Sequence, residues 1–76
     1  MNNERRKQLR DLLERVEAIK SELETIHDEE EEYRDNIPEN MQGSERYEKS
    51  DNAITSVDDA LSNLDDFISN IESAIE

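Results

Sequence analysis

The chain of 76 residues has no cysteine and no tryptophan, one glycine, one proline, one histidine, two tyrosines and one phenylalanine. Without cysteine there are no disulfides, no thiolate metal ligands and no thiol nucleophile. One glycine and one histidine leave no material for a phosphate-binding glycine loop or a nucleophilic triad. Because small domains usually need disulfides, metal or oligomerisation for stability, we expect this chain to self-associate.

Long apolar runs and basic residues are also scarce. No run approaches the ~20 residues of a membrane span, and no apolar segment of a signal peptide is present, so we expect a cytoplasmic protein without membrane contact. Nine Lys and Arg against 22 Asp and Glu give a net charge of -13. This balance disfavours direct binding to nucleic acid, whereas a basic protein partner remains compatible with it.

What the chain does have is heptad repetition, and its periodicity argues against the disorder that the composition alone would allow. From Ser56 to Ile75 three similar heptads carry apolar residues in three columns beside carboxylates, and the first half repeats apolar residues at spacings of three and four. The only proline and glycine fall at Pro38 and Gly43. We therefore predict a single all-α domain: an antiparallel hairpin with helices over about residues 3–35 and 45–75, a turn over 36–44, and Ser44 as N-cap.

The heptad columns predict how the two helices meet. With Leu9 and Tyr47 at position a, the d positions are apolar in both helices: Leu12, Ile19, Ile26, Val57, Leu64 and Ile71. The neighbouring e column is mainly basic in the first helix and acidic in the second. One antiparallel register then satisfies three ion pairs, Arg6 with Glu72, Lys20 with Asp58 and His27 with Asp51.

A third apolar column in the second helix comprises Ala53, Ala60, Phe67 and Ala74. Three apolar positions per heptad are typical of bundles with more than two helices. These four residues are therefore the predicted oligomer seam, and we expect two hairpins to form a four-helix bundle. The alternative is a monomer in which the alanines cover the flank of the first helix.

Positive charge is concentrated in residues 1–20, with six basic and four acidic side chains; the remainder has three basic and eighteen acidic. Those three, Arg34, Arg46 and Lys49, flank the turn and with Tyr47 form a candidate anion or nucleotide site. The alternative is local salt bridging of Glu30 with Arg34 and of Glu45 with Lys49. Glu30 also interrupts the apolar seam and needs a partner, for which Arg46 is one candidate.

The acidic residues support several readings. Asp58, Asp59, Asp65, Asp66 and the run over 28–32 could compete with DNA for a basic groove, or serve only solubility. Glu29 to Glu32 followed by Glu48 and Asp51 fit the EExE and ExxD pattern of all-α nucleoside triphosphate pyrophosphatases, which hold Mg²⁺. Glu24 and His27 have the spacing of di-iron bundles, but the second helix lacks matching inward carboxylates. We predict no metal and no cofactor.

Two resemblances concern the turn. The stretch from Asn36 to Glu48 resembles a segment of small uncharacterised acidic helical-hairpin proteins of Gram-positive bacteria and their phages. Residues 44–50, Ser-Glu-Arg-Tyr-Glu-Lys-Ser, are similar in layout to phage proteins that sequester cyclic-oligonucleotide immune signals. The resemblance implies a phage origin more than an activity.

Together these features predict a non-catalytic protein that self-associates as a homodimer or higher oligomer and acts by binding another macromolecule. The first interpretation is a phage or mobile-element inhibitor that presents an acidic surface as a nucleic-acid mimic. A structural adaptor, a nucleotide sponge at the turn and a pyrophosphatase-like enzyme are the alternatives.

Overall fold

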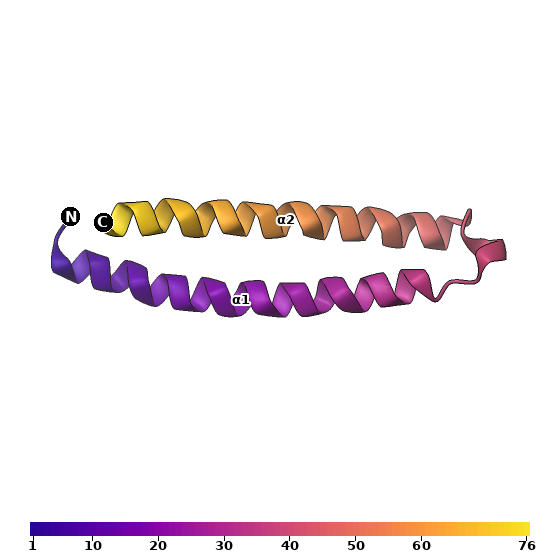
Figure 1. The fold of residues 1–76 in the computed structure, drawn as a ribbon, viewed down its shortest axis with the longest axis horizontal. Coiled ribbons are helices and arrows are strands. Elements are labelled where there is room, and N and C mark those ends of the chain that lie inside the picture. The colour runs from indigo at the N-terminus through magenta and orange to yellow at the C-terminus, as the bar shows by residue number, and fades with distance from the viewer.

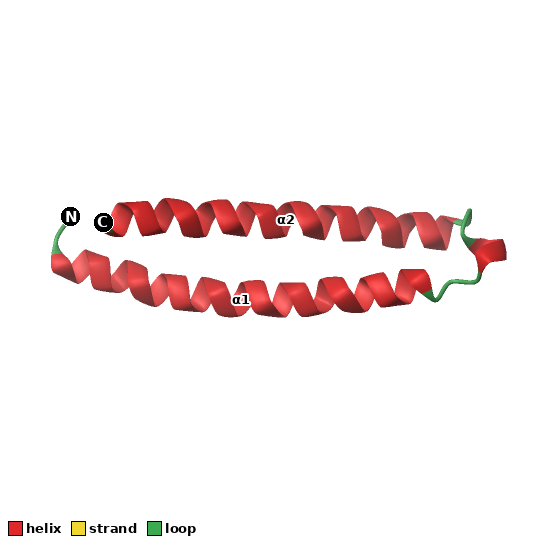
Figure 2. Ribbon diagram, viewed as in Figure 1, coloured by secondary structure: helices red, strands yellow, loops and turns green.

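A computed structural model describes residues 1–76 and shows an antiparallel helical hairpin (Figure 1). Helix α1 covers Asn3–Asp35 and α2 covers Glu45–Ile75, with a single 3-10 turn, η1, at Glu39–Met41 between them. Apart from the connection and the ends of the chain, the molecule is helical, and it contains no strand (Figure 2). The rod measures 59 × 15 × 13 Å. The all-α hairpin and both helix boundaries predicted from the sequence are confirmed, and neither helix is long and apolar enough to cross a membrane.

Both helices begin at side-chain caps. The Asn2 side chain accepts a hydrogen bond of 2.8 Å from the Arg5 amide, and Ser44 Oγ accepts one of 3.3 Å from the Tyr47 amide. Such caps satisfy amides that have no intrahelical acceptor. Glu45 in the first turn of α2 adds a favourable interaction with the helix dipole. The predicted N-cap at Ser44 is therefore confirmed.

The seam between the helices differs from the prediction on the α1 side. As expected, α2 turns its a and d columns toward α1; α1 instead uses its a and e columns. Its half-buried e residues are Arg6, Leu13, Lys20, His27 and Arg34. The predicted d residues are left largely exposed: Leu12 at 38%, Ile19 at 54%, Ile26 at 56% and Tyr33 at 42%.

The e column of α1 faces the seam because its side chains combine apolar stems with charged ends. The side chains of Lys20, His27 and Arg34 are only 30%, 12% and 21% exposed, and each reaches a carboxylate of α2. Long basic side chains can cover apolar surface while their charged ends stay in water. With Leu13 in the same column, this arrangement rotates the d column of α1 away from α2.

The resulting core is very small. Only Ile37 and Ile54, at 3% and 4% exposure, are buried apolar residues, and Ser50 at 4% is the only buried polar one. All three lie in the half of the rod that contains the turn. Since burial of apolar surface is the main stabilising term in folding, much of the hairpin's capacity for burial is unused in a single copy.

Candidate interaction surfaces

One edge of the hairpin carries a ladder of ion pairs between the two e columns. Lys20 lies 2.5 Å from Asp65, His27 Nε2 lies 2.6 Å from Asp58, and Arg34 Nη1 donates to Asp51 at 2.8 Å. The prediction that a basic column faces an acidic one is therefore confirmed.

The individual partners are wrong by one heptad. Lys20 was expected at Asp58 and His27 at Asp51, but each contacts the carboxylate seven residues further along α2. Arg6 does not pair with Glu72; its Nε donates to the Ile75 carbonyl at 3.0 Å, one of the last carbonyls of α2 without an intrahelical partner.

The tilt of helical side chains explains the displacement. Every Cα–Cβ bond leans toward the N-terminus of its own helix. In an antiparallel pair, an α1 side chain therefore leans toward later residues of α2, and an α2 side chain leans back toward it. The cation and the carboxylate therefore meet when the α2 residue is the one seven positions later in the sequence, so Lys20 contacts Asp65 and not Asp58.

These contacts raise the pKa of all three cations. For Lys20 the main cause is the hydrogen bond to Asp65. The pKa of His27 rises above its usual 6.5 because of Asp28, whose Oδ1 lies 3.4 Å from Nδ1, with further contributions from Asp58. The short contact to Asp58 is poorly aligned for a hydrogen bond, so His27 Nε2 has an ion-pair neighbour but no acceptor in line with it. For Arg34 the pKa rises through hydrogen bonds to Asp35 and Asp51.

The other edge carries an apolar surface that one copy leaves uncovered. We call it the open apolar face; it consists of Leu12, Ile19, Ile26 and Tyr33 of α1 together with Ala53, Ala60, Phe67 and Ala74 of α2. Of the α2 residues, Phe67 is 44% exposed and Ala60 is half-buried. The α2 part is the predicted oligomer seam, whereas the α1 part was expected inside the hairpin.

A groove shows that the two columns share this surface. It has a volume of about 350 Å³ and is lined by Ile26 and Tyr33 from α1 and by Ala53, Ile54 and Val57 from α2, among others. Because the remaining members of each column follow at heptad intervals, the same side of the rod carries them all. The sequence signal that could have revealed the α1 part is Leu13: an apolar residue in the e column indicates that this column, too, faces the seam.

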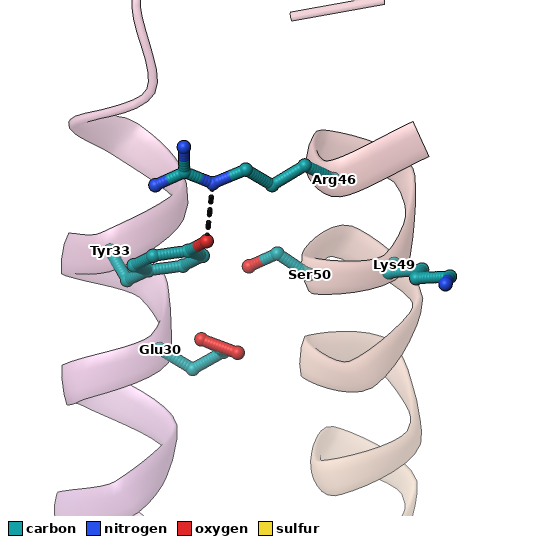
Figure 3. A pocket seen from close by; sticks show the side chains of 5 residues that line it. All are labelled: Glu30, Tyr33, Arg46, Lys49 and Ser50. Atoms are coloured by element: carbon teal, nitrogen blue, oxygen red, sulfur yellow. Dashed lines mark hydrogen bonds between the residues drawn. The ribbon is translucent and has the colours of Figure 1, made fainter. Parts of the chain in front are cut away.

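A second cavity lies at the turn end of the rod. Its volume is about 460 Å³, and it is lined by Glu30, Tyr33, Arg46, Lys49 and Ser50 (Figure 3). Arg46 reaches across from α2, with its guanidinium carbon 5.1 Å from the centre of the Tyr33 ring and its Nε donating to the Tyr33 hydroxyl at 2.5 Å. Ser50 Oγ is buried without a hydrogen-bond partner, and Lys49 points away from the cavity in Figure 3.

The residues predicted for a turn site are thus only partly assembled. Arg46 and Lys49 line the cavity, whereas Arg34 and Tyr47 do not. Lys49 pairs with Glu45 at 3.1 Å, as the local salt-bridge alternative predicts. The pairing of Glu30 with Arg34 is wrong, because Arg34 binds Asp35 and Asp51. Glu30 is half-buried and makes no ion pair, with Arg46 or any other residue.

The predicted acidic surface divides into two kinds of carboxylate. Asp58 and Asp65 belong to the ion-pair ladder, while Asp59 and Asp66 are exposed and form no ion pair. Of the EExE and ExxD residues, Asp51 is also engaged, as the partner of Arg34. The carboxylates that remain accessible to another molecule are therefore fewer than the composition suggests.

One group of side chains has the composition of a metal site. His27, Asp28 and Glu31 each offer a ligand atom, and these atoms lie within 4.8 Å of one another. Asp28 and the Asp58 carboxylate already occupy the two ring nitrogens of His27 as ion-pair neighbours. Since a metal needs the neutral imidazole, these contacts, which favour the protonated ring, oppose metal binding.

Comparison of the chain with known protein families, with curated proteins and with solved structures finds no match.

Proposed function

We propose that the protein is a non-catalytic interaction protein in which two hairpins pack through the open apolar face into a four-helix bundle. The observation that carries the proposal is the exposure of four large apolar residues at heptad spacing on a helix that already has a partner. Contiguous exposed apolar patches that are bordered by charged residues are typical of protein–protein contacts. A strip along the axis of a helix fits another helix.

The energetics make such association marginal rather than overwhelming. Five large residues of the face are 38–56% exposed, namely Leu12, Ile19, Ile26, Tyr33 and Phe67. Completing their burial yields about 1 kcal/mol each, or roughly 10 kcal/mol for two copies. Association itself costs about 4–15 kcal/mol. The charges around the face therefore decide how the copies are arranged and how tightly they bind.

Substitution on the face tests this proposal. Ile26→Asp places a carboxylate where a second copy would bury it, and it should abolish the dimer without unfolding the hairpin, because Ile26 is 56% exposed in one copy. Thr25→Asp introduces the same charge one position away, on an exposed residue outside the face. This variant should have the same solution mass as the unmodified chain. Equal masses for both variants in sedimentation equilibrium would contradict the proposal.

The partner of the assembled bundle is a basic macromolecule. Support comes from the net charge of -13 and from exposed carboxylates that no cation of the chain neutralises, such as Asp59 and Asp66. A DNA-mimic inhibitor is the form of this function that the sequence favours. It would displace a labelled duplex from a basic DNA-binding protein. That activity should fall for Asp59→Asn with Asp66→Asn, which leaves the ion-pair ladder intact; an undiminished effect would contradict mimicry.

A second candidate function is capture of a small anion or nucleotide at the turn end. The observation that favours it is the cavity lined by Arg46 and Tyr33, with Ser50 Oγ buried beside it. Guanidinium and aromatic groups bind phosphate and base respectively. A thermal-shift screen with nucleotides should then show stabilisation that Arg46→Ala removes. No shift with any nucleotide would eliminate this candidate.

A further inference from the structure

The ion-pair ladder gives the relative heights of residues along the rod. Lys20 contacts Asp65 and His27 contacts Asp58, and because the two side chains of each pair lean toward each other, backbones at one height differ from these pairs by a few residues. Ile19 is the central residue of α1, which covers Asn3–Asp35. Ile19 therefore lies level with the part of α2 between Ala60 and Phe67, near the centre of the open apolar face.

Charge is distributed very unequally between the two halves of the rod. Residues 21–59, which form the turn half, contain fourteen acidic and three basic side chains; the other residues contain eight acidic and six basic. If two copies packed with their turns together, the two strongly acidic halves would lie side by side. Packing with turns at opposite ends places each acidic half beside the nearly neutral half of the other copy, which lowers the repulsion.

In this opposed orientation α1 lies antiparallel to α1 of the second copy, and heptad spacing allows two registers. In the first, the two-fold axis passes at Ile19; in the second, it passes between Ile19 and Ile26, about 5 Å further along. The first overlaps the full length of both α1 helices.

The charged residues beside the face also distinguish the registers. Arg15 and Glu22 lie one helical turn from the d column, are exposed, and form no ion pair within the hairpin. With the axis at Ile19, each Arg15 lies beside Glu22 of the second copy. In the other register, Glu22 lies beside its own counterpart, which is unfavourable. The axis at Ile19 also brings Arg5 of the second copy to the groove that Glu30 lines, and Glu30 lacks an ion pair.

From these observations we infer that a second copy of this chain docks antiparallel on the open apolar face, with the two-fold axis at Ile19 and with reciprocal pairs of Arg15 and Glu22. The inference rests on the self-association proposed above and names its geometry. The 33 residues of α1 overlap over about 50 Å, and with the 15 Å width of the rod this gives a footprint of roughly 750 Å² per copy, close to the about 800 Å² per partner of a standard stable interface.

Crosslinking of single-cysteine variants tests the geometry, since the chain has no cysteine of its own. With a short bismaleimide, Ile19→Cys alone should give crosslinked dimers, and so should a mixture of Leu12→Cys and Ile26→Cys. Ile26→Cys alone should give none, because its counterpart would lie about 20 Å away along the rod. Crosslinking of Ile19→Cys only with Ile26→Cys would show the other register. Crosslinking of Ile19→Cys only with Ala60→Cys would show turns at the same end. Either result overturns the inference while leaving self-association intact, and a monomeric mass overturns both.

A charge exchange provides a second test that leaves the apolar contacts unchanged. Arg15→Glu and Glu22→Arg each replace two attractive contacts by repulsive ones and should raise the dissociation constant of the dimer about tenfold. The double variant restores opposite charges between copies and should recover most of the affinity. Arg10→Glu, on an exposed position outside the face, is the matched control for the change in net charge. No recovery in the double variant overturns the pairing.

Discussion

Ile54→Ala should destabilise the hairpin more than any other single truncation on α2. Ile54 is 4% exposed and is the only buried apolar residue of that helix. Removing a buried Ile side chain down to Ala costs about 2–5 kcal/mol. A 76-residue chain has a total stability of roughly 4–11 kcal/mol, so this one change removes a large part of it. Urea unfolding followed by circular dichroism should show a midpoint shifted strongly to lower urea.

The matched control is Ile26→Ala, the same chemical change at a position that is 56% exposed in one copy. At protein concentrations well below the dissociation constant it should cost less than about 1 kcal/mol, and its cost should grow with concentration as dimer forms. The cost of Ile54→Ala should be large at every concentration. Equal costs for the two variants in dilute solution would refute the assignment of Ile54 to the core and of Ile26 to the open face.

Three further changes have defined outcomes. His27→Gln should lower the melting temperature more at about pH 5.5 than at about pH 8.5. The pKa of His27 is higher in the folded chain than its usual 6.5, so the protonated ring stabilises the fold fully below pH 6.5, and this stabilisation is lost as the pH rises through the pKa of the folded chain. A difference in melting temperature that grows with pH would contradict this. Ser44→Ala removes the N-cap of α2 and should cost about 0.5–2 kcal/mol in urea unfolding, whereas Ser44→Gly should cost only a few tenths. Ser50→Ala removes a buried hydroxyl without a partner and should leave the unfolding free energy unchanged or raise it by up to about 1 kcal/mol; a clear loss would show that the hydroxyl is bonded in solution.

The fold could be predicted from the sequence because its signals are local. Heptad spacing, the single proline and glycine, and the cap at Ser44 determine where each helix begins and ends. The sign of the charge in the two e columns likewise indicated correctly which edges of the helices meet.

The rotation of α1 and the choice of ion-pair partners could not be predicted from column membership alone. Whether the d or the e column faces the seam depends on how much apolar stem Lys20 and Arg34 can bury while reaching a carboxylate. The partner that each cation reaches depends on side-chain tilt, which a list of heptad positions does not contain. Glu30 could be recognised as an interruption of the seam, but its lack of a partner emerges only from the positions of Arg34 and Arg46.

The solution mass of the unmodified chain, measured by sedimentation equilibrium between about 1 and 100 μM, tests self-association through the open apolar face most directly. The mass should rise with concentration toward twice 8.9 kDa. Ile26→Asp should stay at 8.9 kDa over the same range. A mass of 8.9 kDa for the unmodified chain at every concentration would contradict self-association through this face.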